Sequence, residues 1–312
     1  MYKVFLVIIF IVLGFTSFAI RMLSKNQFPN YLYMDSLNLD HHALSQSGHE
    51  QNKLIFLGSS GVAGSNVPLF STVSDFFNIH QKKYESYNLA TLQGTMPEVL
   101  VYFKQSLKYS PSAVVLGLSP DTLPRFSVSP VSAINLSFIQ EDLDPELTTF
   151  IKEESRKKLY LNELTEKFWP HYPPPFQLIK LKSALYELRE SLYGPLSNKN
   201  FTGALQHKLT MPDANHLQIK IVLQIAKKCQ KNGIPFFIYF EPMFGAEKVY
   251  GQNLKKYQDR LKEILTQHQV VSFDYTNLIQ EKSLFSDYIH LKPKGYERLA
   301  IKLSQDLEGN MP

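Results

Sequence analysis

The chain has 312 residues, of which 44% are hydrophobic and 13% aromatic, so it can bury one sizeable domain with an insertion, or two small domains. The formal charge of +5 comes without an arginine-rich cluster or an interleaved basic and aromatic stripe, which argues against nucleic-acid binding. The single cysteine, Cys229, excludes an internal disulfide and is expected to be buried. No Cys/His cluster has metal-ligand spacing, so we expect neither a metal nor a cofactor.

The N-terminus carries a membrane signal. Lys3 precedes an uncharged run from Val4 to Ile20, which is about as short as a membrane-spanning helix can be. We predict that residues 1–24 form a single-pass anchor in the cytoplasmic membrane, with the rest of the chain outside the cytoplasm, either periplasmic or extracellular. Ser17-Phe-Ala19 has the small residues of a signal-peptide cleavage site, so secretion after cleavage near Ala19 is the alternative.

Residues 25–52 are polar and predict a linker. From residue 53 onward, short apolar runs alternate with amphipathic stretches, which is typical of a parallel sheet covered on both faces. The predicted strands are Lys53–Leu57, Ser86–Ala90, Ala113–Leu118, Pro235–Phe240 and Val270–Tyr275. The predicted helices are Pro68–His80, Pro97–Tyr109, Asn215–Asn232, Leu254–His268 and Pro293–Leu307. Residues 53–312 should therefore form a flavodoxin-like three-layer α/β/α domain with a parallel sheet of about five strands.

Between Asp121 and about Asp213 the alternation stops. This insertion holds a charged helical stretch, Asp144–Phe168, and the proline-rich Trp169–Pro175, which cannot be helical. Insertions after strands usually lie over the ligand face of such a sheet. The segment is therefore either a cap or partner-docking element, or a helical elaboration that only packs.

A serine turn follows the first predicted strand. The apolar run ends at Leu57 and is followed by Gly58-Ser59-Ser60, after which Gly61 and Gly64 keep the turn open. A serine at the carboxyl end of a buried strand stands where open α/β sheets place ligands and nucleophiles. Taken alone, the segment also fits a glycine-serine turn without chemistry.

A second polar segment precedes the last predicted helix. Asp287 and His290 are three residues apart, a spacing that lets the carboxylate orient the imidazole towards a distant serine. In the helix that follows, Tyr296, Leu299, Ala300, Leu303 and Leu307 share one face, which should be buried. We predict that Ser60, Asp287 and His290 meet at the carboxyl edge of the sheet as a catalytic triad.

Together these two segments resemble the SGNH (GDSL-type) hydrolase superfamily. Its Gly-Asp-Ser-x-x-x-Gly block corresponds to residues 58–64, which places the nucleophile at Ser60, and its Asp-x-x-His block corresponds to residues 287–290. Ser59 stands where that block has aspartate. Gly-Ser-Ser is more similar to the membrane-anchored branch that includes DltD-like proteins and the partners of membrane-bound O-acyltransferases.

The resemblance also implies an oxyanion hole. Its donors would be the amide of Ser60, a glycine after the second strand, for which Gly94 is the candidate, and an asparagine after the third strand. The chain has Ser119 at that last place, so either its hydroxyl substitutes for the asparagine or the third donor is missing. Loss of one donor can cost about 10²–10³ in rate, which favours a slow transferase over vigorous hydrolysis.

Glu241 directly follows the fourth predicted strand and lies at the same edge by strand direction. It is a candidate substrate-binding residue for a polar group, and a carboxylate that closes a loop is the alternative.

The motifs and the resemblance imply an exported serine esterase or acyltransferase that needs no cofactor. It would act on O-acyl groups, acetyl or D-alanyl, of a cell-envelope polysaccharide or teichoic-type polymer, with a membrane-bound O-acyltransferase as partner. The alternative is a non-catalytic SGNH-like module that binds glycan or scaffolds a membrane complex, which the missing asparagine favours. An anchored structural protein with accidental motifs is a third class.

Overall fold

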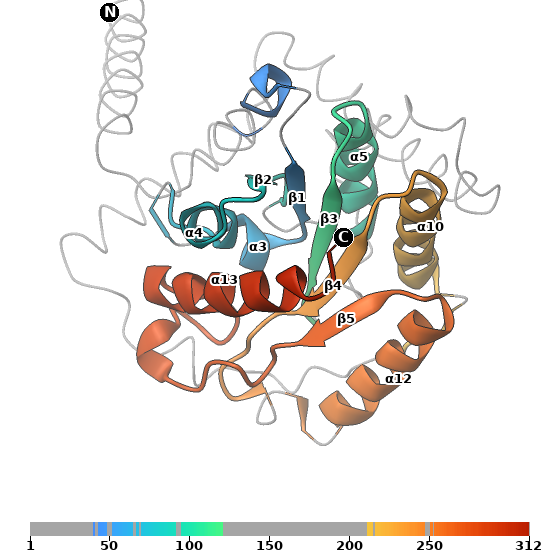
Figure 1. The fold of residues 1–312 in the computed structure, drawn as a ribbon. Helices are drawn as coiled ribbons and strands as arrows, with labels where there is room; N and C mark the ends of the chain where they lie inside the picture. The colour runs from blue at the N-terminus through green and yellow to red at the C-terminus, as the bar shows by residue number, and fades with distance from the viewer. Residues whose placement is uncertain are drawn as a thin grey trace, which may run out of the picture.

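The computed structural model describes residues 40, 43–48, 52–64, 67–68, 70–91, 95–120, 211–214, 216–246, 250–251 and 253–311. Its strands are β1 (Lys53–Leu57), β2 (Glu85–Asn88), β3 (Ala113–Leu118), β4 (Phe236–Phe240) and β5 (Val271–Asp274). They form one parallel sheet in the order β2-β1-β3-β4-β5 (Figure 1). The predicted five-stranded parallel sheet is confirmed, and its strand order is that of a flavodoxin-like doubly wound fold.

Helices cover both faces of the sheet (Figure 1). α4 (Val73–His80) and α13 (Pro293–Glu308) pack on one face, whereas α5 (Met96–Leu107), α10 (Leu217–Lys231) and α12 (Asn253–Gln267) pack on the other. The side chains of β1 alternate between the two cores: Leu54 and Phe56 face α4 and α13, and Ile55 and Leu57 face the opposite helices. This arrangement gives the three layers that the sequence predicts.

The topology fixes where the functional edge lies. β1 pairs with β2 on one side and with β3 on the other, so the chain connections run in opposite directions from the middle of the sheet. Leu57 pairs in register with Leu116, which brings the segments that follow β1 and β3 to the same edge. In doubly wound folds this topological switch point is where ligands bind.

Capping residues set the starts of two helices. The sequence predicts that the first helix begins at Pro68. In the structure α4 begins at Val73, because Thr72 and Asp75 cap each other reciprocally. Thr95 donates its backbone N–H to Glu98 in the same way and starts α5 at Met96. β2 ends at Asn88 rather than at the predicted Ala90; β1 and β3 have the predicted bounds, and the other boundaries differ from the predicted ones by at most two residues.

Two predicted regions lie outside the described residues: the anchor at residues 1–24 and residues 121–210 of the insertion. Among the helices that the structure does describe, none is long and apolar enough to cross a bilayer. Cys229 is buried, as predicted, and burial raises the pKa of its thiol to about 12.

Part of the predicted linker, residues 25–52, packs on the domain. Residues 43–46 are helical, and Leu44 is only 1% exposed within the core on the α5 side. Ser47 and Asp40 both interact with the edge strand β2: Ser47 hydrogen-bonds Tyr87, and Asp40 accepts from the backbone of Asn88. The polar composition of this segment hides the apolar anchor Leu44, which periodicity could not identify.

The buried leucine supports a first prediction. Leu44→Ala should lower the free energy of unfolding by about 2–5 kcal/mol, because it removes a fully buried side chain from the core. Gln46→Ala, an exposed position on the same stretch, should change it by less than about 0.5 kcal/mol. Urea unfolding of both variants checks this, and equal midpoints would contradict the docking of the segment.

Asp40 supports a second prediction, on pH dependence. Burial, followed by the charge of Asp75, raises the pKa of Asp40 to about 7, and the Asn88 amide only partly opposes them. A carboxyl whose pKa is higher in the folded state stabilises the fold at low pH and loses that contribution as pH rises towards 7. Asp40→Asn should therefore flatten the decline in stability between about pH 4 and 7. Thermal unfolding across this range tests the change, with the exposed Asp259→Asn as the control.

Candidate active site

The turn that carries Ser60 depends on a close approach of backbone to side chain. After β1, the chain passes through Gly58 and Ser59 into α3 (Ser60–Ala63), a single helical turn that ends at Gly64 in the left-handed conformation. A Cβ on Gly58 would lie 2.4 Å from Cγ2 of Val62, so only glycine allows the chain to turn here. Ser60 is thereby placed at the first position of α3. The sequence predicts a turn here but not a helix, because four residues are too few to show a helical periodicity.

A side chain from β2, for which the sequence predicts no functional role, hydrogen-bonds to the backbone of α3. Asn88, the last residue of β2, donates from Nδ2 to the carbonyl of Val62 at 2.9 Å. Its Oδ1 accepts the backbone N–H of Ala90 at 3.1 Å. The only signal in the sequence is a polar residue at the end of a buried strand, which by itself does not indicate this role.

The loop before α13 presents the histidine. Oδ1 of Asp287 accepts the backbone N–H groups of Ile289 and His290 at 2.9 and 2.8 Å, which fixes the turn between the two triad residues. Ser286 donates its backbone N–H to the carbonyl of His290 at 2.8 Å and closes the base of the loop. The Asp-x-x-His spacing thus lets one carboxylate both shape the turn and reach the imidazole.

The structure brings Ser60, His290 and Asp287 together. Nε2 of His290 lies 2.9 Å from Oγ of Ser60, and Nδ1 of His290 lies 2.6 Å from Oδ2 of Asp287. The side chains of His290 and Asp287 are 14% and 19% exposed, so they are sheltered from bulk water while remaining open on one side. This hydrogen-bonded relay joins residues that are 230 positions apart in the sequence.

The electrostatics of the relay follow from its contacts. Burial opposes the charged form of Asp287, but the hydrogen bond and charge of His290 and the two backbone N–H groups outweigh it and hold the pKa of the carboxyl below its usual value. An ionised carboxylate only accepts hydrogen bonds, so the imidazole proton lies on Nδ1. Nε2 is then free to accept the hydroxyl proton of Ser60.

The other predicted site groups are the oxyanion-hole donors and the substrate-binding residue Glu241. Ser60 begins α3, and the first backbone N–H groups of a helix have no partner within it, so its amide suits an oxyanion donor. Ser119 follows β3 at the switch point and is buried. Gly94 lies outside the described residues. Glu241 follows β4 and is also buried, with Oε2 against the backbone of Gly61 in α3.

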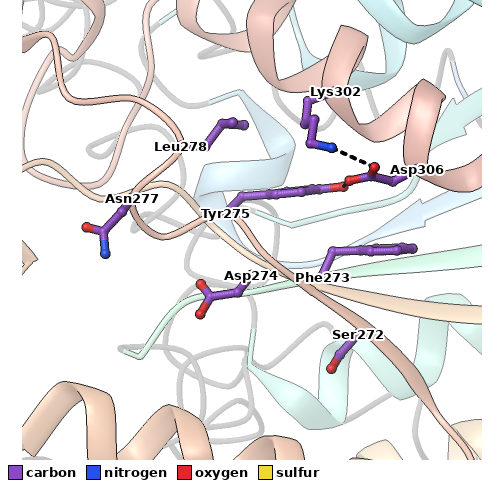
Figure 2. Close-up of a pocket in the computed structure, with 8 residues that line it drawn as sticks. All are labelled: Ser272, Phe273, Asp274, Tyr275, Asn277, Leu278, Lys302 and Asp306. Atoms are coloured by element: carbon purple, nitrogen blue, oxygen red, sulfur yellow. Dashed lines mark hydrogen bonds and ion pairs between the residues drawn. The ribbon is translucent and has the colours of Figure 1, made fainter.

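A groove runs along the edge strand β5, and none of the triad residues lines it (Figure 2). One hydrogen bond joins its walls: the hydroxyl of Tyr275, which follows β5, donates to Asp306 on α13 at 2.7 Å. Lys302 pairs with the same carboxylate at 2.7 Å within α13. We assign both contacts a structural role.

Within the described part of the chain, no group of His, Cys, Asp and Glu residues has the arrangement of a metal site. No protein-family model and no curated protein matches the chain.

The solved structures that match the chain include a lipase/acylhydrolase, a GDSL-like lipase and an esterase. A lipase/acylhydrolase from Enterococcus faecalis has 10% sequence identity and a TM-score of 0.44, covering 84% of this chain and 98% of that one. A GDSL-like lipase from Bacteroides thetaiotaomicron has 12% identity and a TM-score of 0.42, covering 88% and 97%. The psychrotrophic esterase EstA from Pseudoalteromonas has 12% identity and a TM-score of 0.41, covering 83% and 100%. Because all three TM-scores are below 0.5, we draw no functional conclusion from these structures.

Fold and site together define a doubly wound α/β protein with a Ser-His-Asp relay at its topological switch point.

Proposed function

We propose that the chain is a serine esterase or O-acyltransferase that works through an acyl-enzyme on Ser60. The observation that carries this proposal is the continuous hydrogen-bonded relay from Oγ of Ser60 through the imidazole of His290 to Asp287. A nucleophile that contacts a base, with a third group orienting the base, is the arrangement that covalent acyl transfer requires.

The chemistry proceeds in two halves. Nε2 of His290 takes the proton of Ser60 as Oγ attacks the ester carbonyl carbon, and Asp287 stabilises the imidazolium that forms. The tetrahedral intermediate collapses by breaking the bond to the leaving alcohol, which receives that proton from His290. An acceptor hydroxyl, or water, then attacks the acyl-enzyme with His290 again acting as base, and Ser60 is regenerated.

The oxyanion would be stabilised by the Ser60 amide, by Gly94 and by Ser119. Support for Ser119 is its position after β3, next to β1, where the two strand ends meet at the switch point. A serine hydroxyl in place of an asparagine amide is a less rigid donor, which suits slow transfer to a preferred acceptor.

The acyl group would be acetyl or D-alanyl, which is what the resemblance to the membrane-anchored branch implies. Export would make a cell-envelope polysaccharide or teichoic-type polymer the acceptor. The uncharged run Val4–Ile20 supports anchoring in the cytoplasmic membrane with the catalytic domain outside the cytoplasm, in the manner of DltD-like proteins. A membrane-bound O-acyltransferase would be the partner that supplies the acyl group.

A direct test uses the purified chain with p-nitrophenyl acetate and a fluorophosphonate probe. We expect one covalent phosphonyl adduct per chain and steady release of p-nitrophenol. Adding a polyol or a cell-envelope glycan separates the two reactions. If the acceptor becomes acetylated while p-nitrophenol release stays constant, the reaction is transfer. If free acetate is the only acetyl product, the reaction is hydrolysis.

The non-catalytic SGNH-like module is the second candidate, favoured by the serine at position 119. It predicts glycan binding without any adduct. A chain that remains unlabelled under conditions that label a reference serine esterase would exclude the acyl-enzyme.

A further inference from the structure

Gly61, the residue that follows the nucleophile, is contacted by side chains from two other elements. The hydroxyl of Tyr296, on α13, donates to the carbonyl of Gly61 at 2.6 Å. Glu241, directly after β4, approaches from another side: a Cβ added to Gly61 would lie 1.9 Å from its Oε2. Neither contact belongs to the Ser-His-Asp relay.

Both side chains are polar, although an apolar side chain could fill the same buried space. Tyr296 and Glu241 are 1% and 4% exposed, and burying a carboxylate or a hydroxyl costs free energy that an apolar side chain of similar volume would not. Burial, followed by the charge of Glu241, holds the pKa of Tyr296 well above its usual value. The tyrosine therefore keeps its proton and remains a donor to Gly61 at any working pH.

One of these contacts connects the halves of the relay, and the other limits the movement of Gly61. Gly61 is bonded to Ser60, and α13, which carries Tyr296, begins three residues after His290. A hydrogen bond between Tyr296 and Gly61 thus ties the serine turn to the helix that follows the histidine. Glu241 blocks the space into which the Gly61 backbone would otherwise move. Displacement of this peptide would lengthen the 2.9 Å contact between Oγ of Ser60 and Nε2 of His290.

We propose that Glu241 and Tyr296 are positioning residues, which fix the Gly61 peptide and so hold Ser60 against His290. This inference rests on the proposed function, because it takes Ser60 as the nucleophile. It gives Glu241 a role in acylation rate rather than in substrate affinity, which distinguishes it from the substrate-binding role predicted from the sequence.

The test measures p-nitrophenyl acetate turnover and the fluorophosphonate labelling rate of five variants in the full chain. Since a misplacement of about 1 Å can cost about 10²-fold, we expect Tyr296→Phe to lower kcat by about tenfold and Glu241→Ala by about 10²-fold, with KM unchanged. Glu241→Gln retains the shape and should lose less than Glu241→Ala. Gly61→Ala should also lose activity, and the loss in Gly61→Ala/Glu241→Ala should be less than the product of the single losses, because the smaller side chain makes room for the methyl group.

Tyr275→Phe is the matched control. It too removes a buried hydroxyl that hydrogen-bonds across to another element, but its partner is Asp306 rather than the serine turn. Its thermal stability should fall as in Tyr296→Phe while kcat stays at the wild-type value. Circular dichroism below the melting temperature verifies folding, and Tyr296→Phe alone carries the test if Glu241→Ala does not fold.

The outcomes are distinct. Equal kcat in wild type, Tyr296→Phe and Glu241→Gln would overturn the positioning role and leave the proposed function intact. A raised KM with unchanged kcat in Glu241→Gln would overturn it in favour of substrate binding. A wild-type chain without any adduct would overturn the proposed function and this inference with it.

Discussion

Ser60→Ala should abolish fluorophosphonate labelling and lower kcat for an activated acetate ester by about 10⁴–10⁶-fold, the range seen when one member of a catalytic triad is removed. The reason is that this hydroxyl is hydrogen-bonded to Nε2 of His290, which in the proposed mechanism takes its proton as Oγ attacks the carbonyl. The fold should remain intact, because the lost atom lies on a partly exposed side chain at the edge of the sheet. Rates of p-nitrophenol release and intact-protein mass spectrometry measure the two effects.

Ser59→Ala is the matched control, one residue earlier on the same turn. Ser59 contributes its carbonyl, which accepts the backbone N–H groups of Val62 and Ala63 at 3.0 and 2.9 Å, and alanine keeps that carbonyl. Labelling should therefore persist, with a loss of stability of at most about 1 kcal/mol at this helix-capping position. If the phosphonyl group of the wild-type adduct maps to Ser59, the assigned nucleophile is wrong.

The middle of the sheet was predictable because β1, β3 and β4 each contain a continuous apolar run, as in Ala113–Leu118, where all six residues are buried. The final helix was predictable from its apolar face, and Tyr296, Leu299, Ala300, Leu303 and Leu307 are all buried as expected. These features depend on local periodicity, which a single sequence displays directly.

Apart from the relay of Ser60, His290 and Asp287, which the motifs indicated, features that depend on contacts between distant segments were not predictable. Glu241 lies 180 positions from Gly61 in the sequence, and only the packing of β4 beside the serine turn brings its carboxylate to that backbone. Likewise, the sequence places Tyr296 on the apolar face of its helix but does not indicate its hydrogen bond. The acceptor of its hydroxyl is a backbone carbonyl, which any residue type supplies. Leu44 packs into the core from a polar segment for the same reason.

The relay predicts a second large effect, on the orienting carboxylate. Asp287→Asn should lower kcat by about 10³–10⁴-fold, close to the loss seen when a triad aspartate becomes asparagine. If the amide NH₂ faces Nδ1, the imidazole proton must move to Nε2, and His290 can no longer accept the proton of Ser60. The amide oxygen can still accept the backbone N–H groups of Ile289 and His290, so the loop should keep its shape.

Stability measured against pH separates this electrostatic effect from misfolding. The pKa of Asp287 is lowered in the folded chain, so its charge stabilises the fold above the unfolded value of about 4, and this contribution is lost as pH falls through the lower folded value. Asp287→Asn should therefore be less stable than wild type at pH 7 and approach it in acid, while remaining folded at 25 °C. Asp287→Ala, which also removes the acceptor for the two backbone N–H groups, should be less stable than Asp287→Asn at pH 7. Turnover of Asp287→Asn within about tenfold of wild type would mean that Asp287 does not set the tautomer of His290, and the relay would then lack its third member.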